Sequence, residues 1–436
     1  MLKLALRLLR YHRGGAVATG LIALVGTALV TAMAALLGTG LADGTAAADR
    51  PFLTQFPLIM GGWVVAIVVF AVVSTVTVTL GGRAGEISGL RLLGAAPRQV
   101  RVMVSAETFA VAAVAAPPGL GLGYLLGLLV LAGVRSSGLT DPVSGYAPGF
   151  LLPLAGAVVV LAASVVAAWT GSRKAAERGP VDVPVVTRVR RSGRPRRVAA
   201  VVLLVAGIGS ASAVLGLSAD DIATTAMTGP ATVLTAIGLA ILAPELVSLA
   251  NRLARVPRGA SGHLAAVNLA VAPDRLRPAV TFLTLLVGVA AGTLSMQGIE
   301  NEHSASGGTA RVLASINYLV VVLIALFMAI ALTNNLVAAL GRRREEFAAM
   351  SLIGATAGQT RRMLLWEIAA ATVVSVLAAV VGAVVCVVPF SIVKTGGVAA
   401  AFAPGPYLLS IALGVVLALG VTTGAGNRAI GAATAS

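Results

Sequence analysis

Ten long apolar runs dominate this chain, and each is long enough to cross a membrane as a helix. They cover residues 16–40, 57–80, 104–134, 150–170, 198–217, 231–250, 279–297, 312–340, 363–393 and 407–423. A membrane-spanning helix needs about 20 mostly apolar residues. The runs are rich in Ala, Leu, Val and Gly and show no strict alternation, which favours helices over a β-barrel. We therefore predict an all-α polytopic membrane protein with about ten transmembrane helices. The sixth run, which contains Pro244 and Glu245, is the least regular.

The charged residues indicate how the chain is oriented. Hydrophobic residues make up 58% of the chain and charged residues 11%, too few to cover a soluble domain of this size. The net charge of +16 comes from bases at the N-terminus and in the connections after the second, fourth, sixth and eighth runs. The intervening loops hold mainly Asp and Glu. This is the positive-inside pattern, so we predict a cell-membrane protein with both termini cytoplasmic, and it explains the charge without a nucleic-acid partner.

A 25-residue segment occurs twice, at a fixed offset of 260, each time before an apolar run. The copies are residues 83–107 and 343–367. Matched pairs include Glu86 with Glu346, Gly94 with Gly354, Gln99 with Gln359 and Glu107 with Glu367. The offset spans an even number of crossings, so the halves are predicted to be parallel repeats. The first and seventh runs also match, at an offset of 262.

These patterns predict the organisation of the chain. Residues 1–56 hold an N-terminal amphipathic segment, the first and uncleaved helix and an outer loop. Residues 57–171 and 312–428 form two three-helix units. Between them we expect a basic, extended cytoplasmic linker at 172–197, a helix pair at 198–262, and a seventh helix with a short outer loop at 263–311. Residues 429–436 are a C-terminal tail.

Each repeated segment is predicted to begin with a short helix on the cytoplasmic membrane surface. Its apolar face would comprise Ile87, Leu90 and Leu93 in the first copy and Phe347, Met350 and Ile353 in the second. Gly94 and Gly354 stand where each helix would stop. A single such helix is typical of an interfacial anchor. Two copies preserved in length and order favour docking of a partner, with Glu86 and Glu346 as charged contacts.

The order of residues in the repeated segment resembles that of a known protein family. The repeated segment resembles the FtsX-like permease domain of ABC transporters. The features that carry the resemblance are, in order, a base, a Glu, an apolar triplet, Leu-Gly-Ala, Gln-x-x-Arg and a Glu at the start of the next span. That group includes MacB, the lipoprotein-releasing permeases and the bacitracin-type peptide-resistance permeases. The resemblance implies that helices 86–94 and 346–354 are coupling helices seated on a separate ATPase dimer, two copies per permease, which binds ATP and Mg²⁺.

The sequence also departs from that family. The outer loops 41–56 and 298–311 are short where relatives carry large outer domains, which leaves the substrate open. Ser351 and Gly358 replace the bases at Arg91 and Arg98, so the two docking surfaces are predicted to be unequal.

The chain shows no catalytic, cofactor or metal motif of its own. It has no phosphate-binding G-x-x-x-x-G-K-[ST] loop. His303 lies near Glu300 and Glu302, but without metal-site spacing. ATP hydrolysis is therefore expected of another chain. Glu107 and Glu367 open matching spans, where they are either interfacial carboxylates beside Arg101 and Arg361 or links that carry coupling-helix movement into the bundle.

A stripe of small residues follows one face of the third run. Gly119, Gly123 and Gly127 stand at intervals of four. Close helix packing explains such a stripe, and a lipid-facing entry groove is the alternative.

These observations predict the permease subunit of an ABC transporter that exports or extracts an amphipathic, lipid-like or peptide substrate, such as an antimicrobial peptide. The alternative is a non-transporting permease that signals the state of the ATPase to an outer-surface enzyme or a sensor kinase. A secondary transporter would need ionisable residues at midspan, which are scarce here.

Overall fold

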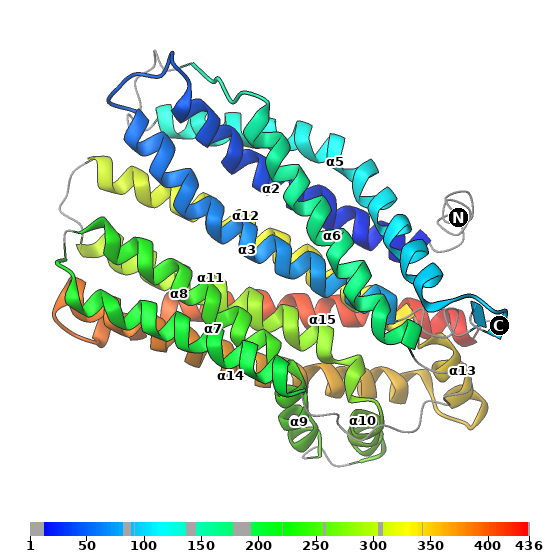
Figure 1. Ribbon diagram of the computed structural model, residues 1–436. Coiled ribbons are helices and arrows are strands. Elements are labelled where there is room, and N and C mark those ends of the chain that lie inside the picture. The colour runs from blue at the N-terminus through cyan, green and yellow to red at the C-terminus, as the bar shows by residue number, and fades with distance from the viewer. Residues whose placement is uncertain are drawn as a thin grey trace. The chain divides into compact units, whose positions relative to one another are not determined.

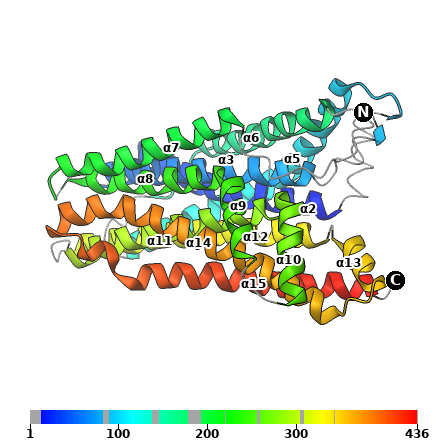
Figure 2. The ribbon, with the colours of Figure 1, turned by 90° about the horizontal axis from the view of Figure 1, so that it is seen from below.

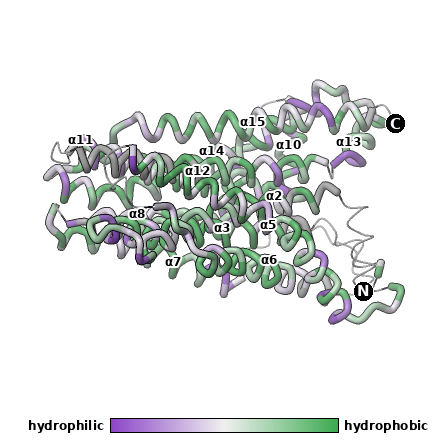
Figure 3. Tube along the Cα trace, turned by 90° about the horizontal axis from the view of Figure 1, so that it is seen from above, coloured by the Kyte–Doolittle hydropathy of each residue, from purple (hydrophilic) through white to green (hydrophobic). Residues whose placement is uncertain are grey.

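The computed structural model describes residues 13–81, 89–90, 92–136, 145–177, 193–219, 221–255, 259–303, 308–341 and 343–434. Over these residues the chain is helical and contains no strand (Figure 1). Ten of the described helices are long and apolar enough to cross a membrane. Hydrophilic residues gather toward the ends of the long helices, while their middle parts are hydrophobic (Figure 3). The prediction of an all-α polytopic membrane protein is confirmed.

The chain divides into two compact units. Unit 1 comprises Met1–Val183 and Ser304–Phe327, and unit 2 comprises Pro184–His303 and Met328–Ser436. The helices of unit 1 are α2 (Arg13–Leu41), α3 (Arg50–Gly81), α5 (Pro97–Ser136) and α6 (Leu151–Glu177). Those of unit 2 are α7 (Arg194–Ala213), α8 (Ile222–Ile241), α9 (Ala243–Leu253), α10 (Ala260–Val271), α11 (Arg277–His303), α13 (Arg344–Leu352), α14 (Ala357–Thr395) and α15 (Pro404–Thr434). The boundary between the units falls within α12 (Gly308–Gly341).

In unit 1 the helix α2 packs against α3, α5 and α6, most extensively against α5. The glycine stripe of α5 makes this contact. A methyl group on Gly119 would lie 2.8 Å from the carbonyl oxygen of Leu24, and one on Gly123 would lie 2.4 Å from Cβ of Thr31. No larger side chain fits at this approach, because the two helix backbones are too close. The interpretation of the stripe as a helix-packing surface is confirmed.

In unit 2 the helix α11 takes the corresponding central position and packs against α8, α14 and α15. Here the small residues come from both helices. Ala379 and Ala383 of α14, the equivalents of Gly119 and Gly123, pack beside Gly288 and Gly292 of α11. The two repeats thus reproduce one close helix contact with small side chains placed differently.

The sixth run does not form a single helix. Helix α8 ends at Ile241, and α9 begins at Ala243 with Pro244 in its first turn and Glu245 beside it. Proline and an acidic side chain are both favourable in a first helical turn, so these residues start α9 and do not continue α8. Helices α9 and α10 cross the direction of the long helices (Figures 1 and 2). The sequence did not predict α10 as a helix.

Most of the predicted basic linker, residues 178–192, lies outside the described residues.

Candidate functional site

Both copies of the repeated segment contain the same glycine turn. Gly94 and Gly354 have φ angles of 90° and 91°, a conformation that other residues adopt only with strain. In the first copy the amide of Ala95 donates to the carbonyl of Leu90 at 3.1 Å, and the second copy forms the equivalent bond at 2.9 Å. An added methyl group at either glycine would meet nothing within 4 Å, so the backbone alone requires glycine here.

A glutamine caps the start of the long helix that follows each turn. Gln359 Oε1 accepts from the amide of Thr356 at 2.9 Å, and Thr356 Oγ1 accepts from the amide of Gln359 at 3.2 Å. This reciprocal cap satisfies two amide groups that a helix start leaves unpaired. In the first copy Gln99 Oε1 accepts from the amide of Ala96 at 3.0 Å. The repeated glutamines therefore fix the direction in which α5 and α14 begin.

A pair of large apolar side chains stands exposed beside each turn. Leu92 and Leu93 are 65% and 87% exposed, and the equivalent Leu352 and Ile353 are 88% and 84% exposed. Such exposure of neighbouring apolar residues at the same place in both repeats is typical of an interaction surface. We call these four residues the tip residues. The sequence predicted Leu93 and Ile353 as outward-facing but did not identify Leu92 and Leu352.

The rest of the predicted docking face of the second copy turns inward. Phe347 is 2% exposed and packs in a cluster with Leu340, Met363 and Ile430, against which Met350 is partly buried. Phe347 therefore belongs to the core of unit 2, and the expectation that it faces a partner is corrected. The reason is that apolar side chains from α10, α12, α14 and α15 already cover that side of α13.

In the first copy, Leu90 is half-buried, while Glu86 and Ile87 lie outside the described residues.

A buried charge network ties α13 to α14. Arg343, just before α13, donates from Nη1 to Glu367 Oε2 of α14 at 2.6 Å and from Nη2 to Glu346 Oε1 at 2.9 Å. Arg343 is 8% exposed and Glu367 is 5% exposed. A buried pair with two-sided hydrogen bonding holds its geometry firmly, because breaking either partner leaves an uncompensated charge.

Two further side chains complete the network. Asn268 of α10 donates from Nδ2 to Glu367 Oε1 at 3.1 Å, and Arg275 forms an ion pair with Glu346. Glu346 is thus engaged within the chain, in contrast to the expectation that it contacts a partner. No local pattern identified Asn268, and Arg275 was only one of several bases after the sixth run.

The charges of the network reinforce one another. Burial by itself would lower the pKa of Arg343, but Glu367 and Glu346 raise it above its usual value. Burial would likewise raise the pKa of Glu346, and the hydrogen bonds and charges of Arg343 and Arg275 lower it instead. Arg343 and Glu346 therefore stay ionised at neutral pH.

Glu367, near the start of α14, thus pairs with Arg343. Arg361, which we considered as its partner, is exposed. In unit 1 the equivalent Glu107 is also 5% exposed and makes a polar contact, while Arg101 lies over the ring of Trp169, 4.2 Å from its centre. In unit 2 Glu367 thus joins the start of α13 to α14, and its role in coupling stays a prediction.

Comparison with known proteins agrees with the repeat. The model of the family described as FtsX-like permease C-terminal matches residues 58–180 and 318–433, which together make up more than half of the chain. Each match contains one long helix that follows a glycine turn, α5 or α14. No curated protein matches the chain.

Proposed function

The chain belongs to the FtsX-like permease family, and on this premise we propose that it is the membrane-spanning subunit of an ABC transporter. A separate ATPase chain supplies ATP hydrolysis, with ATP and Mg²⁺ bound on that partner. The work done on the partner is passed to the spans through the two repeated segments.

The observation that carries this proposal is the recurrence of the exposed tip residues. Leu92 and Leu93, like Leu352 and Ile353, are held by a glycine turn and a capped helix. Burying four large apolar side chains against a partner would stabilise the complex by about 1.5–3 kcal/mol each at full burial. Two equivalent surfaces suit two copies of one ATPase.

We assign the buried network the task of coupling. A push on α13 reaches α14 through Arg343 and Glu367, and both ends of that contact are fixed by further bonds to Glu346 and Asn268. The contact couples as a rigid unit because none of its charges can be left unpaired at low cost. Glu107 is assigned the same task at the start of α5.

The proposed cargo is amphipathic: a lipid-like molecule or a peptide, exported or extracted from the membrane. The support is that the ion pairs described in unit 2 lie toward the ends of the spans. Arg343 and Glu367 pair near the start of α14, and Lys394 pairs with Glu300 at its other end, 3.1 Å apart. Among the described residues these pairs provide no charged site at midspan for a small ion.

The orientation is tested by labelling opposite ends of α14. Ile353 and Val398 are both exposed and can each be replaced by Cys in a Cys386→Ala background. An impermeant thiol reagent added to intact cells should label Val398→Cys and leave Ile353→Cys unlabelled until the cells are lysed. Labelling of Ile353→Cys from outside would refute a cytoplasmic docking surface.

The function itself is tested by purifying the chain alone and with the ATPase encoded beside it. The isolated chain should hydrolyse no ATP, and the complex should have the mass of one permease with two ATPases. Substrate movement by the complex in vesicles supports transport. ATPase activity that alters a bound sensor kinase without moving any substrate would identify the signalling alternative.

A further inference from the structure

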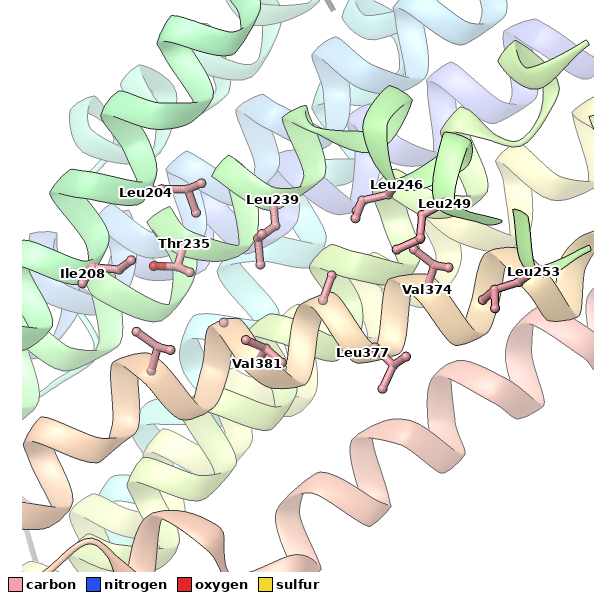
Figure 4. Close-up of a pocket in the computed structure, with 13 residues that line it drawn as sticks. Leu204, Ile208, Thr235, Leu239, Leu246, Leu249, Leu253, Val374, Leu377 and Val381 are labelled. Atoms are coloured by element: carbon pink, nitrogen blue, oxygen red, sulfur yellow. The ribbon is translucent and has the colours of Figure 1, made fainter. Parts of the chain in front are cut away.

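Unit 2 contains an apolar groove between α7, α8, α9 and α14, with a volume of about 540 Å³. Leu204 of α7, Leu239 of α8, Leu249 of α9 and Val381 of α14 line it, and they converge on a common space (Figure 4). The volume is in the range of pockets that hold small ligands. Thr235 is the one lining residue with a polar side chain.

The chemistry of the groove excludes a polar ligand. The hydroxyl of Thr235 lies 3.1 Å from Sγ of Cys386 and is hydrogen-bonded to it, so it offers little to a guest. On the open side Leu377 and Val381 are 59% and 62% exposed. These residues belong to a helix that crosses the membrane, so the groove opens to lipid tails and not to water. Hydrocarbon is the material that fills such a space.

The groove ends at α9, where the surroundings become basic. Leu246, Leu249 and Leu253 of α9 face the groove, and Arg252 and Arg255 are exposed at the end of the same helix. Neither arginine forms an ion pair with any residue that the structure describes.

The start of α7 brings further bases to α9, at its first turn, whereas Arg252 lies in its last turn. Arg197 of α7 pairs with Glu245 of α9 at 3.0 Å, and Arg194 and Arg196 flank it. The guanidinium of Arg196 donates from Nε to the carbonyl of Ile241 at 2.9 Å, so Arg197 is the base that these contacts place on Glu245. Long arginine side chains can lie along apolar surface and still place their charge at the level of the lipid headgroups.

We propose that the groove binds one acyl chain of an anionic phospholipid, whose phosphate lies against Arg252 and Arg255. The lipid is a resident ligand that fills the space between α9 and α14 and is distinct from any transported cargo. The inference does not depend on ATP coupling, since it rests on the groove and on the charges at its end.

The acyl-chain site is tested by native mass spectrometry of the purified chain titrated with phosphatidylglycerol. Ala378 lines the groove, so Ala378→Phe should fill it and reduce phosphatidylglycerol adducts at least fivefold. Ala412 is exposed on α15, outside the groove, and Ala412→Phe is the matched control that should bind like the unaltered chain. Equal adducts in both variants would overturn the proposal. The proposal would also be overturned if Ala378→Phe lost a dimer or a co-purifying protein while its lipid binding stayed unchanged. The groove would then be a protein-docking surface.

The headgroup site is tested with charge-neutral variants. Arg252→Gln with Arg255→Gln should bring binding of phosphatidylglycerol down to that of phosphatidylethanolamine, whereas Arg344→Gln, an exposed base elsewhere in unit 2, should not. Each variant is first checked for an unchanged thermal midpoint in detergent without added lipid. If the unaltered chain binds the two lipids equally, or if the double variant keeps its preference for phosphatidylglycerol, the anionic assignment is wrong.

Discussion

Replacing Glu367 by Gln should destabilise the protein by removing one charge from the buried network. In the unaltered chain Glu367 accepts the 2.6 Å bond from Arg343 and a 3.1 Å bond from Asn268. Both members of the central pair are less than a tenth exposed. Water can therefore compensate little for a lost charge.

The magnitude follows from what remains around each charge. Breaking a buried pair by removing one partner costs about 3–5 kcal/mol. In Glu367→Gln, Arg343 keeps Glu346, and the new amide keeps one oxygen as an acceptor, so we expect about 2–3 kcal/mol. Arg343→Gln leaves Glu367 with its bond from Asn268 but without the cation that was paired with it, and we expect about 3–5 kcal/mol.

The assay is equilibrium unfolding in detergent, monitored by circular dichroism. Glu345 is exposed beside Glu346, so Glu345→Gln is a matched control whose effect should stay within about 0.5 kcal/mol. The double variant of Arg343 and Glu367 should cost less than the sum of the single variants, by about 1–3 kcal/mol, because each single variant also leaves its partner stranded. The reasoning is refuted if Glu367→Gln costs no more than Glu345→Gln or if the two effects simply add.

Three further predictions concern packing, the turn and pH. Gly123→Ala should destabilise unit 1 by about 1–3 kcal/mol because its methyl group would overlap Thr31, whereas Gly121→Ala meets nothing and should be neutral in the same unfolding assay. Gly354→Ala should cost about 1–2 kcal/mol from the positive φ alone, measured as a shift in the denaturation midpoint. The folded-state pKa of Glu346 lies below its unfolded value of 4.5, so its stabilising contribution is complete above that pH and is lost as the pH falls through the folded-state pKa. The stability gap between the unaltered chain and Glu346→Gln should therefore be constant from about pH 6 to 8 and shrink below about pH 4.5.

The spans and the repeat could be predicted because their signals are local. An apolar run of membrane length indicates a helix whatever surrounds it. The glycine stripe of α5 could be interpreted in the same way, because small residues on one helix face are typical of close helix packing in membranes, although an entry groove stayed open as the alternative. The turns at Gly94 and Gly354 followed from their position after a short amphipathic segment.

What the sequence could not predict depends on contacts between distant segments. Periodicity showed that Phe347, Met350 and Ile353 share a face, but not that helices from elsewhere in the chain cover Phe347. Asn268 lies 99 positions before Glu367, and no local pattern relates the two. Most of α9 was included in the sixth apolar run, and α10 is short, so it resembled a connection between apolar runs.

The most direct test of the account is the affinity of the ATPase for permeases altered at the tip residues. Leu93→Asp and Ile353→Asp place a carboxylate in each proposed contact, and Val398→Asp alters an exposed apolar residue at the other end of α14. In detergent, the double variant at Leu93 and Ile353 should bind the ATPase at least about 100-fold more weakly, since burying an unpaired charge costs several kcal/mol. The affinity of each single variant should lie between those of the double variant and the unaltered chain. Leu93→Asp should bind more weakly than Ile353→Asp because the first copy retains Arg98. Val398→Asp should bind normally. Binding of the double variant at the affinity of the unaltered chain would contradict the claim that these turns dock the ATPase.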